Sequence, residues 1–340
     1  MTDVLWVATG LAAQLTGIER FALGLAGALL TEGVLVPEQL AVMVDERSRW
    51  AGPLEEAGVA VTRVRHGRWR RAKSPYTRPL VVHNLGGGRF PTRIAKTPSQ
   101  TRIYSVYDWG PVRDSTISTK TRLAWVAVMV DGMRGADVVH YLNPELELTR
   151  PWLLPAPTRS VVSYANSALS DAATITAPTA TSGLSRYALF VGTAAPRKRL
   201  PDVAAMARLT NTPVVMVGAG TEAFRGSPNV TALGRVDDIR LRCLLDHCDA
   251  LVLVSAYEGF GVPILEAAAR GIASVVSSEV AMTLPADLQD YVQIVDPSEH
   301  TAFGEAVSAA AARRGLPRYD SRGILRPLLD VYRAALRRQS

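Results

Sequence analysis

The sequence has few cysteines and no long uninterrupted apolar run. Cys243 and Cys248 are its two cysteines among 340 residues, which excludes a disulfide framework, and their spacing matches no common zinc pattern. We interpret both as buried free thiols and expect no metal site. No uncharged apolar run approaches the ~20 residues of a membrane-spanning helix, and no basic region precedes the first apolar stretch, as in a secretory signal. These absences predict a cytoplasmic protein.

Acidic side chains are absent from residues 57–107, a stretch that holds eleven basic ones, seven of them within Arg63–Arg78. Three interpretations stay open: a solvated loop, a surface that attracts an anionic acceptor or the inner face of a membrane, or a nucleic-acid contact. Nothing in the chain resembles a nucleic-acid-binding module, so we expect no nucleic-acid partner. Residues 1–170 carry a net charge of +6 and residues 171–340 one of +1, so the surplus belongs to the first half.

Length and composition indicate two folded domains. Of the 340 residues, 48% are hydrophobic and 20% charged, which suits a globular protein. Domains of ~100–200 residues predict two of them. A stretch rich in Ser, Thr and Ala, residues 166–186, separates two α/β halves and is interpreted as a linker. We therefore predict a first domain over residues 1–165, a second over 187–322 and a last helix over 323–340.

Strand-like runs alternate with helical spacing in both halves, which predicts an α/β fold with parallel sheets. Strands are expected at Val4–Ala8, Leu40–Val44, Val59–Val64, Leu80–Asn84, Ile103–Tyr107, Ala136–His140, Tyr187–Val191, Val214–Val217, Ala250–Ser255 and Ala273–Ser277. Helices are expected at Ile18–Leu30, Arg122–Arg134, Leu200–Leu209, Ile239–His247, Pro263–Arg270, Ala302–Arg313 and Gly323–Arg338. In such sheets, ligands bind at the carboxyl ends of the strands.

The most informative motif is a glycine loop between two glutamates, Glu258-Gly-Phe-Gly-Val-Pro-Ile-Leu-Glu266, between a strand and a helix. Gly259 and Gly261 let a ligand approach the backbone closely, and Pro263 suits the first helical turn. The free N–H groups of a helix start favour a phosphate, while the two carboxylates can bind hydroxyl groups. The pattern predicts a ligand that is part phosphate and part polyol. The alternative is a helix start whose glutamates offset the dipole.

A second motif places three adjacent cations, Arg197, Lys198 and Arg199, after a strand that ends in Gly192 and Thr193. In a crevice at the strand ends these cations can neutralise a diphosphate leaving group without a metal, because fixed positive charge stabilises developing negative charge. The alternative is a solvated run of charges.

A third motif matches the dinucleotide-binding pattern G-x-G-x-x-A, since Gly218, Gly220 and Ala223 follow a strand and Asp237 and Asp238 come later. On its own it suggests an NAD-dependent oxidoreductase. The residues after Ala223 do not have the spacing of the helix that this pattern requires, so we keep that function as an alternative only.

Taken in order, these motifs resemble the donor domain of retaining GT-B glycosyltransferases of the glycosyl-transferase group 1 type, family 4. The resemblance covers Tyr187 to about Ser278, including Leu233-Gly-Arg-Val236 and the E-x7-E pair Glu258 and Glu266. The Val-Gly-Thr and Pro-Arg-Lys elements resemble the bacterial mannosyl- and rhamnosyltransferase subgroup. Residues 16–21 resemble the opening loop and helix of that subgroup more loosely.

The resemblance implies two Rossmann-like domains facing a central cleft, a nucleotide-sugar donor (GDP-, UDP- or dTDP-linked) and no metal or other cofactor. It places Glu266 on the ribose and Glu258 on the donor sugar, and it implies that the last helix crosses back to the first domain. It also assigns the diphosphate to Arg197 and Lys198. The other residues expected at the donor are Gly259, Phe260, Gly261, Val262, Arg235, Val236, Gly192, Thr193 and Gly17.

One departure from the family pattern concerns the acceptor side. The family motif that ends in His-Asp falls on Tyr107 and Asp108, so a tyrosine replaces the family's histidine. A tyrosine can donate a hydrogen bond but cannot become a cation, so acceptor or donor-sugar handling differs or catalysis is impaired. His83 and His140 lie at expected strand ends in the same half and are candidate substitutes, although a lone histidine is more often structural.

We therefore predict a metal-independent retaining glycosyltransferase that moves a hexosyl group to an acceptor hydroxyl on a glycan, a lipid-linked molecule or a small molecule. Glu258, Lys198, Arg197, Asp108 and Tyr107 are its candidate catalytic residues. The alternatives are a nucleotide-sugar 2-epimerase of the same architecture and a catalytically silent nucleotide-sugar-binding partner.

Overall fold

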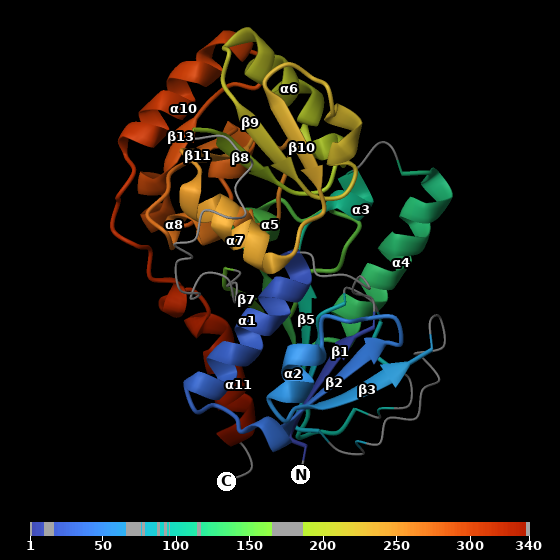
Figure 1. Ribbon diagram of the computed structural model, residues 1–340. Helices are drawn as coiled ribbons and strands as arrows, with labels where there is room; N and C mark the ends of the chain where they lie inside the picture. The colour runs from blue at the N-terminus through green and yellow to red at the C-terminus, as the bar shows by residue number, and fades with distance from the viewer. Residues whose placement is uncertain are drawn as a thin grey trace. The chain divides into compact units, whose positions relative to one another are not determined.

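A computed structural model divides the chain into two compact units (Figure 1). It describes residues 2–9, 17–65, 76, 79–86, 89–91, 94, 96–113, 117–164 and 186–337. Unit 1 comprises residues 1–168 and 322–340, and unit 2 comprises residues 169–321. Most of the basic stretch Arg63–Arg78 and of the expected linker 166–186 lies outside the described residues.

Unit 1 is built on a seven-stranded parallel sheet in the order β3-β2-β1-β4-β5-β6-β7. The strands are β1 (Val4–Ala8), β2 (Leu40–Asp45), β3 (Ala60–Val64), β4 (Val81–Asn84), β5 (Thr101–Val106), β6 (Val138–Tyr141) and β7 (Ser160–Val162). All residues of β1, β2, β4 and β6 are buried, which explains their near-continuous apolar sequences. The chain reverses its direction of travel across the sheet between β1 and β4.

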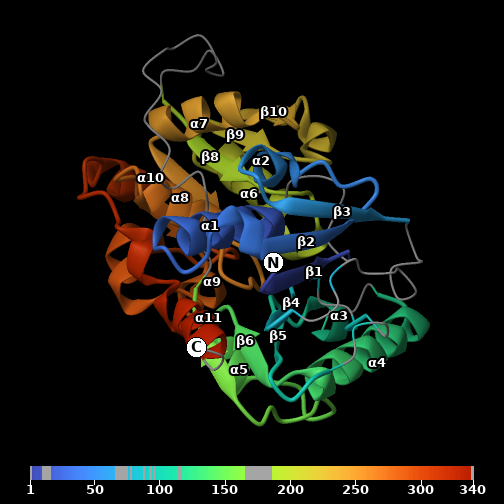
Figure 2. The ribbon, with the colours of Figure 1, turned by 90° about the horizontal axis from the view of Figure 1, so that it is seen from below.

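The helices of unit 1 cover both faces of this sheet. They are α1 (Gly17–Thr31), α2 (Gly52–Glu56), α3 (Gly110–Arg113), α4 (Thr119–Gly135), α5 (Pro144–Leu148) and α11 (Arg326–Arg337). Figure 2 shows α1 and α11 on one side of the sheet and α4 on the other. The last helix, α11, packs on β4 and β7 through an apolar face that repeats every three or four residues and includes Leu328 and Tyr332. The C-terminal segment thus completes the core of the N-terminal unit.

A chain of hydrogen bonds between fully buried side chains crosses this core. Its consecutive contacts are Trp6 Nε1 to Tyr332 OH (2.8 Å), Tyr332 OH to His83 Nδ1 (2.6 Å), His83 Nε2 to Ser105 Oγ (2.7 Å), Ser105 Oγ to His140 Nδ1 (2.8 Å) and His140 Nε2 to Ser163 Oγ (2.9 Å) and O (3.1 Å). Indole N–H only donates and a carbonyl only accepts, so the two ends assign one direction to every bond. Both histidines are then neutral, with the proton on Nε2.

Unit 2 is built on a six-stranded parallel sheet in the order β10-β9-β8-β11-β12-β13. The strands are β8 (Ala188–Val191), β9 (Val214–Val217), β10 (Val230–Gly234), β11 (Ala250–Leu253), β12 (Ser274–Val276) and β13 (Val292–Ile294). Its helices are α6 (Leu200–Leu209), α7 (Asp238–His247), α8 (Val262–Ala268), α9 (Ser278–Ala281) and α10 (Phe303–Ala312). The chain reverses direction between β8 and β11.

The sequence prediction of two parallel α/β domains is confirmed, and its errors concern the edges of the sheets. The strands β7, β10 and β13 were not expected, and each of them is the last strand at one edge. Edge strands are partly exposed and need no continuous apolar run, which removes the signal by which a buried strand is found. The short helices α2, α3, α5 and α9 were missed as well, because four or five residues hold too little periodicity.

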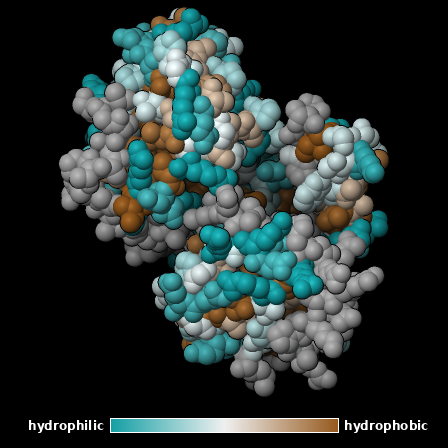
Figure 3. Space-filling view, turned by 45° about the vertical axis from the view of Figure 1, so that its right-hand side comes forward, coloured by the Kyte–Doolittle hydropathy of each residue, from teal (hydrophilic) through white to brown (hydrophobic). Residues whose placement is uncertain are grey.

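The burial of the two cysteines and the polarity of the surface agree with what the composition predicts. Cys243 and Cys248 are both buried and free, as predicted, and burial raises the pKa of Cys248 to about 12. Figure 3 shows one face of the molecule, on which hydrophilic residues (teal) dominate and hydrophobic residues (brown) form small groups. Among the described residues, no helix combines the length and the apolar character that crossing a membrane requires.

The buried hydrogen-bond chain predicts that the protein loses stability in mild acid. Burial lowers the pKa of His140 to about 4, and burial together with the neighbouring His140 lowers that of His83 well below its ordinary value. The unfolded chain, with histidine pKa values near ~6.5, therefore binds more protons than the folded one in this range. Stability should fall as the pH drops from about 6.5 towards 4, by about 3 kcal/mol for His140 alone.

Chemical denaturation measured at several pH values tests this. The variant His140→Asn should be less stable at neutral pH but show a shallower pH dependence. The variant His300→Asn, which changes a surface histidine of unit 2, should keep the profile of the unmodified protein. An identical pH slope in all three proteins would contradict the assignment of neutral buried histidines.

Candidate functional site

The candidate site lies at the carboxyl edge of the sheet of unit 2, where the chain reverses direction between β8 and β11. In parallel α/β sheets, this reversal leaves two adjacent loops that diverge, and ligands bind in the crevice between them. The loop after β8 carries Gly192 to Arg199, and the loop after β11 carries Tyr257 to Gly261. The two strongest motifs of the sequence therefore lie on the two loops that flank this crevice.

The loop after β8 turns sharply enough to place two cations at the sheet edge. Pro196–Lys198 form one turn of 3-10 helix, and Arg199 adopts a left-handed conformation (φ 52°) before α6 begins. A left-handed conformation is unusual for a residue other than glycine and marks a forced change of direction. Thr193 is exposed, whereas Gly192 packs beside the ring of Phe190 and the side chain of Lys198.

Arg197, Lys198 and Glu258 form a buried cluster of charges. The Lys198 ammonium donates to the Glu258 carboxylate, and Arg197 Nη1 lies 2.9 Å from Glu258 Oε1. The side chains of Lys198 and Glu258 are 9% and 7% exposed, and that of Arg197 is 25% exposed. Arg197 also donates to the main-chain carbonyl of Tyr257 (3.1 Å) and lies over its ring. Sequence motifs 60 residues apart thus form one site, with a net charge of +1.

Burial and charge act in opposite directions on Glu258. Burial alone raises the pKa of a carboxyl group, because the charged form loses its hydration. Lys198 and Arg197 outweigh this effect and hold the pKa of Glu258 below its ordinary value. Glu258 is therefore a carboxylate at neutral pH.

The third cation of the motif, Arg199, does not join this cluster. Its Nη2 lies 2.9 Å from Glu279 Oε1, at the start of α9. Both residues line a cavity of about 500 Å³ at the ends of β12 and β13, which Lys198 and Glu258 do not line. The expectation that three cations act together is therefore wrong: two bind Glu258 and the third binds Glu279.

The glycine loop and its helix take the predicted form. Gly261 has a positive φ of 77° and caps α8, and an added side chain there would meet Ile264 and Leu253. Gly259 is partly exposed, whereas Phe260 and Val262 are buried. Glu266 lies on α8 and is 1% exposed. The loop conformation thus requires glycine at position 261.

The dinucleotide pattern is explained by packing between strand ends. A side chain added at Gly218, whose φ is 131°, would overlap the carbonyl oxygen of Gly192, and one at Gly220 would meet Ala194. The chain forms only a short 3-10 helix, Thr221–Phe224, before β10, in place of the long helix of a dinucleotide fold. These glycines allow two loops to approach each other closely. The glycine pattern therefore no longer supports the oxidoreductase alternative.

The residues expected near the base follow directly after β10. Gly234 ends the strand with φ 72°, and Arg235 beyond it is exposed while Val236 is half-buried. Both residues therefore lie at the carboxyl edge of the sheet.

In unit 1, Tyr107 and Asp108 follow β5 directly. The Tyr107 hydroxyl is buried, makes no hydrogen bond within the described residues, and its ring packs edge-on against Phe21 at 5.9 Å. Burial raises the pKa of Tyr107 far above its ordinary value, so the phenol keeps its proton. The Asp108 carboxylate accepts a hydrogen bond from the Gly110 amide (2.7 Å) and so fixes the start of α3.

The other expected residues of unit 1 differ in accessibility. Gly17 is exposed and opens α1, while the loop before it, residues 10–16, lies outside the described residues. His83 and His140 are fully buried members of the hydrogen-bond chain in the core. They are not available to an acceptor hydroxyl, so the hypothesis that either one replaces the missing site histidine is wrong.

Sequence reasoning missed one further pair beside the site, Asp246 and Arg270, which form a buried ion pair between α7 and α8. A signal was present: Arg270 follows Glu266 by four residues, just beyond the end of α8. Its partner on α7 cannot be found from spacing alone.

Comparisons with known proteins agree with this geometry. Residues 185–312 match the family model described as glycosyl transferases group 1. The structure is similar to Anabaena Alr3699/HepE in complex with UDP and glucose (TM-score 0.67, 14% identity, covering 100% of this chain and 99% of that one). It is also similar to sucrose-phosphate synthase from Thermosynechococcus elongatus (0.66, 16%, 100% and 98%) and to WaaG, a glycosyltransferase involved in lipopolysaccharide biosynthesis (0.63, 14%, 97% and 99%). No curated protein sequence matches the chain.

Two statements follow from these matches. Both units are Rossmann-like and have the fold of GT-B glycosyltransferase structures, as predicted. Residues 185–312 match the glycosyl transferases group 1 model, so this segment of the chain is a glycosyltransferase group 1 domain. The cluster of Arg197, Lys198 and Glu258 lies inside the matched segment.

The charge cluster predicts a specific response to removal of its carboxylate. The variant Glu258→Gln leaves the buried ammonium of Lys198 without its counter-ion, which should cost about 3–5 kcal/mol of stability. The melting temperature should fall by roughly 10 °C. Added pyrophosphate should raise it more in the variant than in the unmodified protein, because the two cations are then free to bind the anion.

Thermal melts with and without pyrophosphate measure both effects. Glu279→Gln is the matched control, since it removes the partner of the more exposed Arg199 and should shift the melting temperature little. Equal melting temperatures for Glu258→Gln and Glu279→Gln would show that the cluster is not a buried charge system.

Proposed function

We propose that the protein is a metal-independent retaining glycosyltransferase that moves a hexosyl group from a nucleoside-diphosphate sugar to an acceptor hydroxyl. The observation that supports this most directly is the buried pair of cations, Arg197 and Lys198, at the direction reversal of a group 1 glycosyltransferase domain. Diphosphate departure builds negative charge, and preorganised cations in a poorly hydrated crevice stabilise it. These cations perform the task that a metal ion performs in other transferases.

The donor is held, in this proposal, by the two loops and the helix that follow them. Arg197 and Lys198 bind the diphosphate, Glu258 orients the sugar and Glu266 binds the ribose. Main-chain groups of Gly259 to Val262, Gly192 and Thr193 lie beside the sugar and diphosphate, and those of Arg235 and Val236 beside the base. Gly17, a residue of unit 1, is the remaining expected donor residue. The group 1 match and the placement of most of these residues at one sheet edge support the assignment.

The transfer itself needs no nucleophile from the enzyme. The bond between the anomeric carbon and the diphosphate oxygen breaks, and the acceptor oxygen bonds to the same face of that carbon, which retains the configuration. A phosphate oxygen of the donor takes the acceptor proton. Asp108 and the partly exposed Tyr107 lie at the end of β5 on the proposed acceptor side, while the Tyr107 hydroxyl is itself buried and keeps its proton.

A ligand screen followed by two substitutions tests this function. A thermal-shift screen of GDP, UDP, dTDP, their sugars and NAD should show stabilisation by one nucleoside diphosphate and none by NAD. Lys198→Met and Glu266→Gln should each lower transfer at least about a hundredfold, the usual cost of a lost group that stabilises a transition state. Lys96→Met, which removes an exposed lysine paired with Asp137 in unit 1, is the control and should leave transfer unchanged.

The same screen separates the alternatives. Full transfer activity in both Lys198→Met and Glu266→Gln would contradict the assignment. Consumption of donor without any acceptor would indicate a 2-epimerase. Binding without turnover on any acceptor would indicate a silent binding partner, the alternative that Tyr107 in place of the family's histidine favours.

We further propose that the basic segment 63–78 binds an anionic acceptor or the anionic inner face of the membrane, as a peripheral contact. The support is the absence of acidic residues from 57–107 and the surplus of positive charge in the first half. Substituting Arg68, Arg70, Arg71 and Lys73 by glutamine should weaken binding to vesicles that contain anionic lipid, or to the acceptor. Binding of donor should be unchanged. Unaltered binding to vesicles and acceptor would leave this segment a solvated loop.

A further inference from the structure

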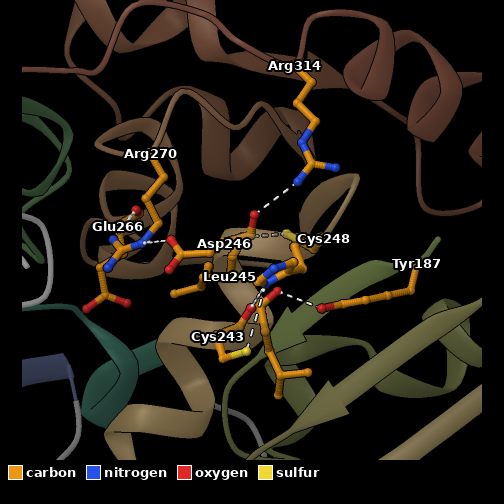
Figure 4. Close-up of polar contacts among 10 residues, drawn as sticks. Tyr187, Cys243, Leu245, Asp246, Cys248, Glu266, Arg270 and Arg314 are labelled. Carbon is orange, nitrogen blue, oxygen red and sulfur yellow. Dashed lines mark hydrogen bonds and ion pairs between the residues drawn. The ribbon is translucent and has the colours of Figure 1, made fainter. Parts of the chain in front are cut away.

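The C-terminal end of α7 is held in an unusually complete way. The last carbonyl groups of a helix lack partners within the helix, yet four successive carbonyls here accept hydrogen bonds from side chains (Figure 4). These bonds are Cys243 O from His247 Nδ1 (2.8 Å), Leu244 O from Tyr187 OH (2.9 Å), Leu245 O from Cys248 Sγ (3.3 Å) and Asp246 O from Arg314 Nη2 (3.0 Å). Tyr187, directly before β8, and Arg314, beyond α10, therefore fix this end of α7 within unit 2.

Asp246 projects from this fixed end toward α8. Its Oδ1 lies 2.9 Å from Nε of Arg270, and the two side chains are 1% and 4% exposed. A buried ion pair of this kind contributes little net stability compared with apolar packing. Removing one partner, however, leaves the other as an uncompensated buried charge. We therefore look for its role in setting the relative position of the two helices that it joins.

Arg270 uses a second nitrogen to hold the helix that carries the site. Its Nη1 donates to the main-chain carbonyl of Glu266 at 2.8 Å, so one guanidinium bridges Asp246 on α7 and the last turn of α8 (Figure 4). The planar guanidinium presents both N–H groups in a fixed geometry. A shift of α8 along its axis, or a rotation about it, would break one of the two bonds.

We propose that Arg270 is a positioning residue of the donor site, which acts by fixing α8 to the immobile end of α7. Helix α8 carries Glu266 and follows directly from Gly261, so both depend on its position. This inference rests on the proposed function for its effect on the donor. The fixing of α8 itself does not depend on that function.

The proposed role of Arg270 predicts different effects on the binding of two parts of the donor, the diphosphate and the nucleoside. Arg197 and Lys198, the proposed diphosphate contacts, lie on the loop after β8 rather than on α8, and they reach the loop before α8 through Glu258. The expected ribose contact, Glu266, lies on α8 itself. Loss of Arg270 should therefore weaken binding of a nucleoside diphosphate while sparing binding of inorganic pyrophosphate, a pattern that general destabilisation would not produce.

Hydrogen exchange and binding on the full chain test this proposal. In Arg270→Met we expect the amides of residues 262–268 to exchange about tenfold faster or more, the effect of losing ~1.4 kcal/mol of local stability. Exchange in β8 and β9 should be unchanged. Affinity for the nucleoside diphosphate selected by the thermal-shift screen should fall about tenfold, and affinity for pyrophosphate should change less than about threefold.

Three further variants keep the test decisive. Arg270→Lys and Asp246→Asn keep more of the buried polarity and should loosen the same helix, so they replace Arg270→Met if that variant does not fold. Arg186→Met is the control, because Arg186 pairs with Asp249 in unit 2 and belongs to neither α7 nor α8. It should leave exchange in 262–268 unchanged.

The outcomes distinguish this proposal from the function on which it rests. Unaltered exchange of α8 in the Arg270 and Asp246 variants, or an equal effect of Arg186→Met, would overturn the positioning role. Equal losses of nucleoside diphosphate and pyrophosphate affinity would overturn it too. If the unmodified protein bound no nucleoside diphosphate, the proposed function would fail, and the exchange result would still decide whether Arg270 fixes α8.

Discussion

The site in unit 2 depends on a carboxylate, Glu258, buried between two cations from a different loop. A buried charge is stable only when it is paired, so Glu258 binds the loop after β11 to Arg197 and Lys198 in the loop after β8. A main-chain bond from the Ala256 amide to the Arg197 carbonyl (2.7 Å) reinforces the same junction. The reversal of direction in the sheet brings these loops together, and the charges hold them there. In a glycosyltransferase, an entering diphosphate would offer the cations a second anion, and the net charge of +1 of the cluster favours its binding.

Much of this site could be predicted from the sequence, because its parts are local. A glycine after a strand, a proline in a first helical turn and a run of cations each have a physical reason within a few residues. The predicted helix of residues 200–209 and the glycine cap at position 261 match the structure. The pairing of Glu258 with Lys198 was not foreseen, although both were nominated, because it depends on which loops the strand order makes adjacent. Arg199 and Glu279 show the same limit: a run of three cations does not reveal that the third turns to another helix.

The acceptor-side unit was harder to predict, and its histidines show why. His83 and His140 lie at strand ends, where a functional histidine is expected as readily as a structural one. The partners of these histidines are Ser105, Ser163 and Tyr332, which come from segments up to about 250 residues away. A local sequence pattern does not predict a hydrogen bond between different strands of a sheet. Polar residues in the core can satisfy one another in a chain that has a donor-only group at one end and an acceptor-only group at the other. Such a chain of hydrogen bonds cannot be predicted until the order of the strands in the sheet is known.

The bond between Trp6 and Tyr332 has a consequence for how the chain becomes a folded protein. Unit 1 is discontinuous, since it consists of residues from both ends of the sequence, whereas unit 2 is a single uninterrupted segment. During synthesis, unit 2 can complete its core while the first sheet still lacks the helix that covers β4 and β7. The polar groups of His83 and Trp6 then lack the Tyr332 hydroxyl, which is synthesised after the whole of unit 2. Unit 1 can therefore complete its core only after the segment of unit 2 has been made, and until then the surfaces of β4 and β7 that α11 covers stay open to other proteins.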